Sequence, residues 1–215
     1  MRGVFVTGTG TEVGKTIVAA AIARTLVDGG ARVGVFKPAV TGLDDPGEAD
    51  HELLRRAAGS AQSDDEIAPY RYGPPASPHL AASLAGEAIE PERLLAAAGA
   101  AGEGADVLVC EGVGGLLVPL AADYTVRDLA ADLGLPLVIA ASPGLGTINH
   151  TLLTLEAARS AGLEVAMVVL TPWPDAPSTV EASNRETIDE LGAVRVETVP
   201  TLDLSDATTW PALAP

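Results

Sequence analysis

Aromatic residues are scarce in this 215-residue chain, and so are cysteines and positive charges. Phe, Trp and Tyr make up only 3% of the residues, so the core must be packed from Ala, Val, Leu and Ile. Stacking platforms for single-stranded nucleic acid are therefore not expected. The formal net charge of -16 repels phosphate backbones and anionic lipids, which argues against nucleic acid and membranes as partners. A bound nucleotide must be held by local groups.

Other absences narrow the class of protein further. The single cysteine, Cys110, excludes an internal disulfide and fits a reducing compartment. No basic region precedes an apolar stretch at the start, and no run reaches the roughly 18 apolar residues of a membrane span, so we expect a cytoplasmic protein. The three histidines are dispersed without the pairing of a zinc site, and no Gly-x-Ser-x-Gly elbow is present.

Apolar β-branched runs alternate with Ala- and Leu-rich helical patterns along the chain. This alternation predicts an α/β fold, with a mostly parallel sheet covered by helices on both faces. The Pro-rich segments 70–78 and 171–177 are predicted to be loops too short to divide the chain, so we expect one domain over residues 1–215. The expected strands are Val4–Thr7, Arg32–Phe36, Val107–Cys110, Leu137–Ala141, Glu164–Leu170 and Val194–Val199. The expected helices are 15–28, 48–58, 91–101, 125–133, 147–161 and 178–191.

The segment between the first strand and the first helix has the features of a phosphate-binding loop. Its glycines allow backbone N–H groups to turn toward phosphate oxygens, and the helix N-terminus adds its positive dipole. Lys15 supplies a charge for the outer phosphates, and the Thr16 hydroxyl suits Mg²⁺. The strict pattern requires glycine where the chain has Thr9, so we expect a longer variant of the loop; a Gly-rich turn ending in a solvated lysine is the alternative. The segment is Gly8, Thr9, Gly10, Thr11, Glu12, Val13, Gly14, Lys15, Thr16 and Ile17.

Charged residues also follow the next two strands, at the edge where open parallel sheets bind ligands. Lys37, converging with Lys15, would neutralise a phosphoryl group and a second anion beside it; a surface lysine is the alternative. Glu111 ends the third strand, where a buried carboxylate requires a cation or hydrogen-bond donors. Two interpretations of the Glu111 carboxylate are open: it binds Mg²⁺, or it caps the backbone of the following glycine loop. Cys110 is expected to be a small buried hydrophobe.

Four motifs occur in a specific order over residues 3–200. They are residues 8–16, Lys37-Pro38 with Thr41-Gly42, residues 111–115 (Glu-Gly-Val-Gly-Gly) and residues 146–151 (Gly-Thr-Ile-Asn-His-Thr). Together they resemble the dethiobiotin synthetase family, whereas the last fifteen residues add nothing to the resemblance. The resemblance implies a P-loop NTPase-like fold and an ATP- and Mg²⁺-dependent ring closure. In that reaction 7,8-diaminononanoate and CO2 give dethiobiotin through a carbamate and a carbamic-phosphoric anhydride.

The resemblance also implies roles for individual residues. Lys37, Lys15 and Thr11 would be catalytic, and Thr16, Asp50 and Glu111 would bind Mg²⁺. Asp44 and Asp45 are alternatives to Asp50 in the acidic segment 44–52. The implied nucleotide-binding residues are 8–17, Asp50, Glu111, Gly112, Val113, Gly114, Thr171, Pro172, Pro200, Thr201 and Leu202. The implied substrate-binding residues are Lys37, Thr41, Gly146, Thr147, Ile148 and Asn149. In the family the last four come from a partner subunit, which implies a homodimer with composite sites.

One departure from the family pattern concerns the nucleobase. Members often have an Asn-containing pair after the fifth strand, whose carboxamide contacts the adenine edge, whereas this chain has Thr171-Pro172. We therefore expect weak discrimination among nucleoside triphosphates. Trp173 is a candidate either for stacking on the base or for loop packing.

Two other classes share the sheet and the phosphate loop. Partitioning or division-site ATPases usually have a basic DNA-binding face or a C-terminal amphipathic membrane helix. This chain has 13 Lys and Arg against 29 Asp and Glu, and its C-terminal sequence is of neither kind. Amidotransferase-linked synthetases carry a separate glutaminase domain, for which 215 residues leave no room.

Overall fold

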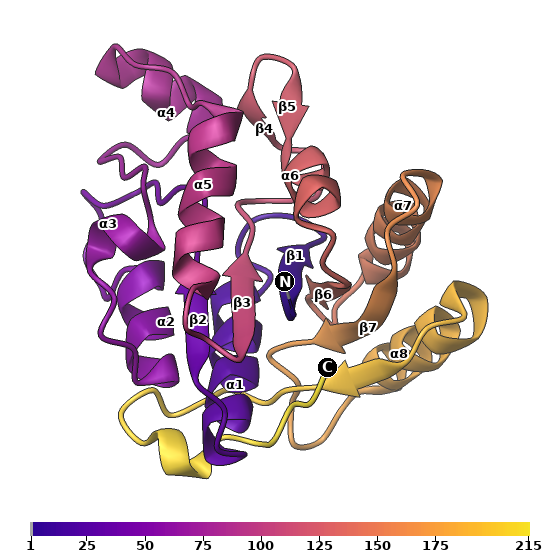
Figure 1. The fold of residues 1–215 in the computed structure, drawn as a ribbon. Coiled ribbons are helices and arrows are strands. Elements are labelled where there is room, and N and C mark those ends of the chain that lie inside the picture. The colour runs from indigo at the N-terminus through magenta and orange to yellow at the C-terminus, as the bar shows by residue number, and fades with distance from the viewer. Residues whose placement is uncertain (1) are drawn as a thin grey trace.

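Six parallel strands form the central sheet in a computed structural model that describes residues 2–215 (Figure 1). Their order across the sheet is β2-β3-β1-β6-β7-β8. The strands are β1 (Gly3–Gly8), β2 (Val33–Phe36), β3 (Val107–Glu111), β6 (Leu137–Ala141), β7 (Val165–Leu170) and β8 (Val196–Thr198). All six predicted strands are confirmed, although β8 is shorter than expected at both ends.

Helices cover both faces of this sheet. On one face lie α1 (Lys15–Asp28) and α2 (Asp50–Ala58); on the other lie α5 (Pro91–Gly102), α6 (Val126–Leu133), α7 (Thr147–Ser160) and α8 (Thr179–Gly192). Successive side chains of β1 point to opposite faces, so Val4 and Val6 pack under α1 while Phe5 packs in the cluster that includes α5 and α6. Because both faces are covered, the central strands are mostly apolar, with Thr7 in β1 and Glu111 at the end of β3 as polar exceptions. The six predicted helices are confirmed.

Several short elements were not predicted. They are α3 (Asp64–Ile67), α4 (Pro78–Ala85), the hairpin of β4 (Pro119–Ala121) and β5 (Tyr124–Thr125), and a 3₁₀ turn at Ala207–Thr209. The prediction of a loop at 70–78 was wrong at its last residue, because Pro78 begins α4 and Gly86 ends it with a φ of 76°. Proline at the first helical position and glycine after the last one mark a helix, and both were present in the sequence. In residues 2–215 no helix combines the length and apolarity needed to span a bilayer.

The C-terminal segment after β8, residues 200–214, is the C-terminal strap. It passes beside α1 and α2 and returns toward the sheet (Figure 1). Trp210 and Leu213 are buried in the cluster under α1, and the Leu213 N–H donates to the Thr25 hydroxyl at 2.8 Å. The C-terminal strap therefore contributes two buried side chains to the folded core.

Strand register brings three loops together at one edge of the sheet. Val6 of β1 pairs with Glu111 of β3, and Phe36 of β2 pairs with Cys110. The residue after β2, Lys37, is therefore level with Glu111 and with the start of the phosphate loop. The chain also reverses direction across the sheet at β1, whose neighbours are β3 and β6, and open sheets bind ligands at such a point.

At the opposite edge, an ion pair ties the starts of β2 and β3 together. The Arg32 guanidinium donates to both carboxylate oxygens of Asp106, at 3.1 and 2.8 Å, and the Arg32 backbone N–H donates at 2.9 Å. These hydrogen bonds lower the pKa of Asp106 to about 2. The stabilisation from this pair is present above the ordinary aspartate pKa and is lost as the pH falls toward about 2.

We expect Arg32→Ala to raise the pKa of Asp106 from about 2 part of the way toward 3.8, because the guanidinium donors are lost while the backbone N–H of residue 32 still donates. A carboxyl-carbon NMR titration of both proteins measures this shift. Arg24→Ala, which breaks a separate exposed pair with Asp28, serves as the control and should leave Asp106 unchanged. An equal midpoint in wild type and Arg32→Ala would contradict the assignment.

Candidate active site

The phosphate loop has the strand, loop and helix order that the sequence predicts. Two residues in it adopt the left-handed conformation, Glu12 with a φ of 57° and Gly14 with a φ of 80°. Helix α1 begins at Lys15, and no side chain caps its first N–H groups. Left-handed turns next to an uncapped helix start direct backbone N–H groups at a bound anion. Holding Glu12, a non-glycine residue, in this conformation costs about 1 kcal/mol or more.

The chain contains only two lysines, and both lie in the cavity beside this loop. Lys15 is 8% exposed and Lys37 is 2% exposed. The Lys15 Nζ donates to the Gly10 carbonyl at 2.9 Å. The Lys37 Nζ lies 2.7 Å from Glu111 Oε1 and 2.8 Å from Asp50 Oδ2. Two cations thus converge on one cavity of about 530 Å³ in a strongly acidic chain.

The side-chain oxygen atoms of Thr16, Asp50 and Glu111 lie close together beside the Lys37 ammonium. Thr16 Oγ1 lies 2.8 Å from Asp50 Oδ1 and 2.9 Å from Glu111 Oε1. A hydroxyl has one proton, so it can donate to only one of these carboxylates at a time. The second oxygen of Glu111, Oε2, is buried and has no hydrogen-bond partner within residues 2–215. One hydroxyl and two carboxylates, one of which has this unpartnered oxygen, form a donor set that fits Mg²⁺, which keeps several waters and needs few protein ligands.

The charges of these groups depend on one another. Burial alone would lower the pKa of Lys37, but the Glu111 and Asp50 carboxylates outweigh it and raise the pKa above the ordinary value. Burial would raise the pKa of Asp50, but Lys37 and the Thr16 hydroxyl hold it below the ordinary value. Burial lowers the pKa of Lys15, with Glu111 opposing the shift. Lys37 is therefore held as an ammonium between two carboxylates.

Among the acidic residues of segment 44–52, the structure brings Asp50 to Thr16. Asp50 is the first residue of α2, and this position directs its carboxylate at the helix start of α1. Asp44 and Asp45 lie elsewhere, near Gly73 and Gly42 respectively. Three residues from outside the predicted set also line the cavity: Glu48 of the same segment, Leu53 of α2 and Leu204 of the C-terminal strap.

Several predicted nucleotide-binding residues lie outside the lining of this cavity. Thr171 is buried against the phosphate loop, because a Cβ built on Gly14 would lie 2.5 Å from its Cγ2. Trp173 packs on the cluster of α7 and α8, which favours the loop-packing interpretation. The others in this group are Gly8, Thr9, Gly10 and Val13 of the phosphate loop, together with Gly112, Pro172, Pro200, Thr201 and Leu202. Their contact with a nucleotide stays a prediction.

The predicted substrate element at the start of α7 does not line the Lys37 cavity within one chain. Gly146 has a φ of 94° and starts the helix without a side-chain cap. Thr147 is buried with its hydroxyl 3.5 Å from that of Thr151, and Ile148 packs on the core. Asn149 is exposed, so this helix start faces outward.

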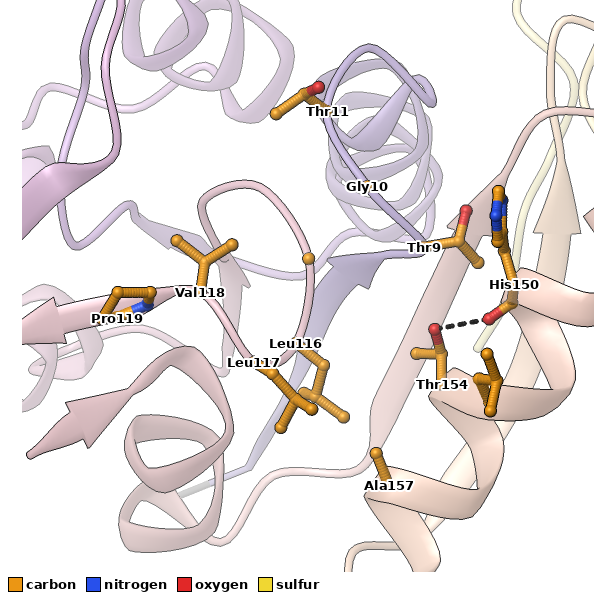
Figure 2. A pocket seen from close by; sticks show the side chains of 12 residues that line it. Thr9, Gly10, Thr11, Leu116, Leu117, Val118, Pro119, His150, Thr154 and Ala157 are labelled. Carbon is orange, nitrogen blue, oxygen red and sulfur yellow. Dashed lines mark hydrogen bonds between the residues drawn. The ribbon is translucent and has the colours of Figure 1, made fainter.

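A second cavity of about 530 Å³ adjoins the phosphate loop on its other side. Figure 2 shows the segment Leu116–Pro119 facing α7 across it, with Thr9 to Thr11 at the end near α1. The lining from α7 is His150, Leu153, Thr154 and Ala157. Thr11 lines both cavities, so the apolar cavity adjoins the lysine-lined one at this residue. The sequence interpretation missed this wall because it depends on the unpredicted segment before β4.

Comparison with known proteins identifies the family. A family model described as an AAA domain matches residues 2–209. The ATP-dependent dethiobiotin synthetase BioD of Bacillus subtilis (strain 168) is 39% identical over 197 residues, covering 91% of this chain and 85% of that protein. The chain belongs to the dethiobiotin synthetase family.

Two further relatives of this family agree. The BioD protein of Anaeromyxobacter dehalogenans (strain 2CP-1) is 48% identical over 171 residues, covering 79% of this chain and 76% of that protein. The BioD protein of Rhodococcus erythropolis is 41% identical over 205 residues, covering 94% of this chain and 87% of that protein. The resemblance drawn from four motifs is therefore confirmed, and these relatives do not favour the partitioning-type alternative.

A solved structure supports the fold. The cell division protein FtsY from Thermotoga maritima matches with a TM-score of 0.50 and 16% identity, covering 95% of this chain and 63% of that one. At this identity the likeness shows the fold alone. The predicted α/β architecture of the P-loop NTPase type is confirmed.

Gly14 provides a test of the phosphate loop. We expect Gly14→Ala to lose nucleotide affinity and about 1–3 kcal/mol of stability, because its positive φ disfavours a side chain and the new Cβ would meet Thr171 Cγ2. Calorimetric titration with Mg-ADP and thermal unfolding measure both effects. Adding Thr171→Ser, which removes the opposing methyl group, should recover part of the loss.

Gly10→Ala is the matched control for stability. A Cβ built on Gly10 meets no atom within 4 Å, so its stability should stay within about 0.5 kcal/mol of wild type. Equal destabilisation of the two variants would show that the close approach of Thr171 to Gly14 is unimportant.

Proposed function

We propose that this chain uses ATP to join CO2 to 7,8-diaminononanoate and closes the cyclic urea of dethiobiotin, releasing ADP and phosphate. The observation that carries the proposal is the convergence of both lysines with Glu111, Asp50 and Thr16 beside the phosphate loop. One substrate amine takes up CO2 and becomes a carbamate. A carbamate oxygen attacks the γ-phosphorus and ADP leaves; the second amine then attacks the carbamoyl carbon and phosphate leaves.

Lys37 would hold the carbamate. Glu111 and Asp50 keep its side chain protonated, so it can donate hydrogen bonds to the carbamate oxygens and offset their charge. An ammonium fixed by two carboxylates needs little reorganisation when the anion arrives. Thr41 lines the same cavity and would donate to the substrate nearby.

Lys15 and the phosphate loop would stabilise the transferring phosphoryl group. The Lys15 ammonium reaches the Gly10 carbonyl from inside the loop and can exchange that contact for phosphate oxygens. Thr11 lines both cavities, so its hydroxyl lies where phosphate and substrate would meet. These groups act by position and charge, and none needs to form a covalent bond with the substrate.

Thr16, Asp50 and Glu111 would hold Mg²⁺, and the bound ion would neutralise charge on the β- and γ-phosphates. Lys37 contacts both carboxylates of this set, so ion and ammonium would share them. The ion would then lie next to the two lysines, where negative charge develops during phosphoryl transfer.

The apolar cavity of Figure 2 would take the aliphatic part of the substrate. Leu116, Val118 and Leu153 contribute apolar surface to it, and it shares Thr11 with the lining of the Lys37 cavity. The substrate carboxylate would bind the uncapped start of α7, residues 146–149, contributed by a partner subunit. The proposal therefore includes a homodimer with composite sites. The reaction would take place in the cytoplasm, without nucleic acid or membrane partners.

The direct test is incubation with Mg-ATP, bicarbonate and 7,8-diaminononanoate, with dethiobiotin followed by mass spectrometry and phosphate release in parallel. We expect diamine-dependent product from the wild type and a loss of about a thousandfold in Lys37→Ala, which removes the charge beside the carbamate. Lys37→Ala should still bind Mg-ATP, which calorimetry checks. Diamine-independent ATP hydrolysis without dethiobiotin in the wild type would rule out the ligase reaction.

Subunit mixing tests the composite site. Lys37→Ala and Asn149→Asp should each be nearly inactive alone, the second because its carboxylate repels that of the substrate. In a heterodimer one of the two sites combines wild-type Lys37 with wild-type Asn149, so an equal mixture should recover about a quarter of wild-type activity. Mass spectrometry of the intact complex verifies subunit exchange. Verified exchange without recovery would contradict a shared site.

Nucleobase preference tests the consequence of Thr171-Pro172. A threonine hydroxyl and a proline without N–H supply less base-specific hydrogen bonding than a carboxamide, so we expect kcat/KM for ATP, GTP and CTP to agree within about a hundredfold. Initial rates with each nucleotide measure this. A preference for ATP above about a thousandfold would show that other groups discriminate the base.

A further inference from the structure

One arginine joins two walls of the nucleotide cavity without lining the cavity itself. Arg56, on α2, donates through Nε and Nη2 to the two carboxylate oxygens of Glu48 at 3.0 and 2.7 Å. Its third nitrogen, Nη1, donates to the Leu204 carbonyl of the C-terminal strap at 2.7 Å. Glu48 and Leu204 both line the cavity that holds Lys15 and Lys37. Arg56 therefore ties the acidic segment and the strap to one helix.

The strap is fixed at its far end by other contacts. The Trp210 indole N–H donates to the Asp203 carbonyl at 2.8 Å, and Arg195 donates to the Ala214 carbonyl at 2.7 Å. Leu213 is buried under α1. The Trp210 bond also reaches the residue beside Leu204, and the Leu204 side chain packs on the cluster under α1. Within residues 2–215, the side-chain hydrogen bond to the Leu204 carbonyl itself comes from Arg56.

The type of residue at position 56 matters for this role. A guanidinium is planar and presents several N–H donors in a fixed geometry. It can therefore donate two hydrogen bonds to a carboxylate and a third to a carbonyl. A lysine ammonium has no such fixed fork. The Arg56 and Glu48 side chains are 42% and 36% exposed, and exposed pairs contribute little to global stability. Loss of the arginine should therefore change the cavity wall more than the stability of the protein.

We propose that Arg56 is a positioning residue for nucleotide binding, which holds Leu204 and Glu48 against the mouth of the phosphate cavity. The inference rests on the proposed function only in that a nucleotide occupies this cavity. Arg56 itself touches neither the phosphate loop nor the two lysines in residues 2–215. Its removal should weaken nucleotide binding without changing the chemical step.

The test is the dissociation constant for Mg-ADP by calorimetric titration, with KM and kcat from the dethiobiotin assay. We expect Arg56→Ala to raise the dissociation constant and the KM for ATP about 5- to 20-fold, while kcat and the KM for the diamine change less than about twofold. Arg56→Lys should recover only part of the loss. Glu48→Gln, which weakens the other end of the contact, should raise the dissociation constant about threefold or more.

Arg55→Ala is the matched control. Arg55 neighbours Arg56 on the same helix but pairs with Asp64, so this variant should bind Mg-ADP within about twofold of wild type. An equal loss in Arg55→Ala and Arg56→Ala would overturn the proposal, as would a fall in kcat with an unchanged dissociation constant in Arg56→Ala.

Hydrogen exchange of the wild type adds a test that needs no variant. Mg-ADP should slow exchange of the backbone amides at residues 203–205, because the strap forms part of the occupied cavity. Unchanged exchange there with the nucleotide bound would contradict the inference. Mg-ADP binding requires no diamine. A wild type that binds the nucleotide but makes no dethiobiotin would therefore contradict the proposed function, while the role of Arg56 in nucleotide binding could still be measured.

Discussion

The buried ion pair between Lys37 and Glu111 is the interaction on which the site depends. Glu111 is fully buried and Lys37 is 2% exposed, with 2.7 Å between their charged atoms. Neither charge could be buried alone without a large desolvation cost, whereas Lys37 offsets the charge of Glu111 and Asp50 by contacting both carboxylates. Lys37 follows β2 and Glu111 ends β3. Because Lys37 also contacts Asp50, the first residue of α2, this group links the edge of the sheet to the start of that helix. A pair of this kind contributes more to the position of charge than to net stability.

The parallel sheet fixes the relative positions of the charged groups in the site. Register between β1 and β3 sets Glu111 level with the residues before the phosphate loop, and α1 and α2 start at the same edge with Thr16 and Asp50 in their first turns. Charged groups on rigid elements need not reorganise during phosphoryl transfer. Both lysines of this strongly negative chain lie in the cavity, among the acidic side chains of Glu12, Glu48, Asp50 and Glu111. Positive charge for an anionic nucleotide would therefore come from these two lysines and from Mg²⁺ bound at the carboxylates.

Much of this arrangement could be predicted from the sequence. The alternation of apolar runs with helical patterns predicted the sheet, and the order of the motifs predicted that Lys15, Lys37 and Glu111 share one edge. The composition held a signal that was overlooked, because a chain with only two lysines places both in the site. Choosing Asp50 over Asp44 and Asp45 required the observed start of α2. The contact of Arg56 with Leu204 joins residues 148 positions apart, and no local pattern encodes it.

The scarcity of lysine permits a direct measurement of the central claim, that one lysine contacts phosphate and the other the carbamate. Protein labelled with ¹⁵N-lysine should give two side-chain ammonium signals, assigned with Lys15→Arg and Lys37→Arg. The account predicts that Mg-ATP shifts the Lys15 signal most strongly. Bicarbonate with 7,8-diaminononanoate should shift the Lys37 signal. A Lys37 signal that stays unchanged while the wild type makes dethiobiotin would contradict the account.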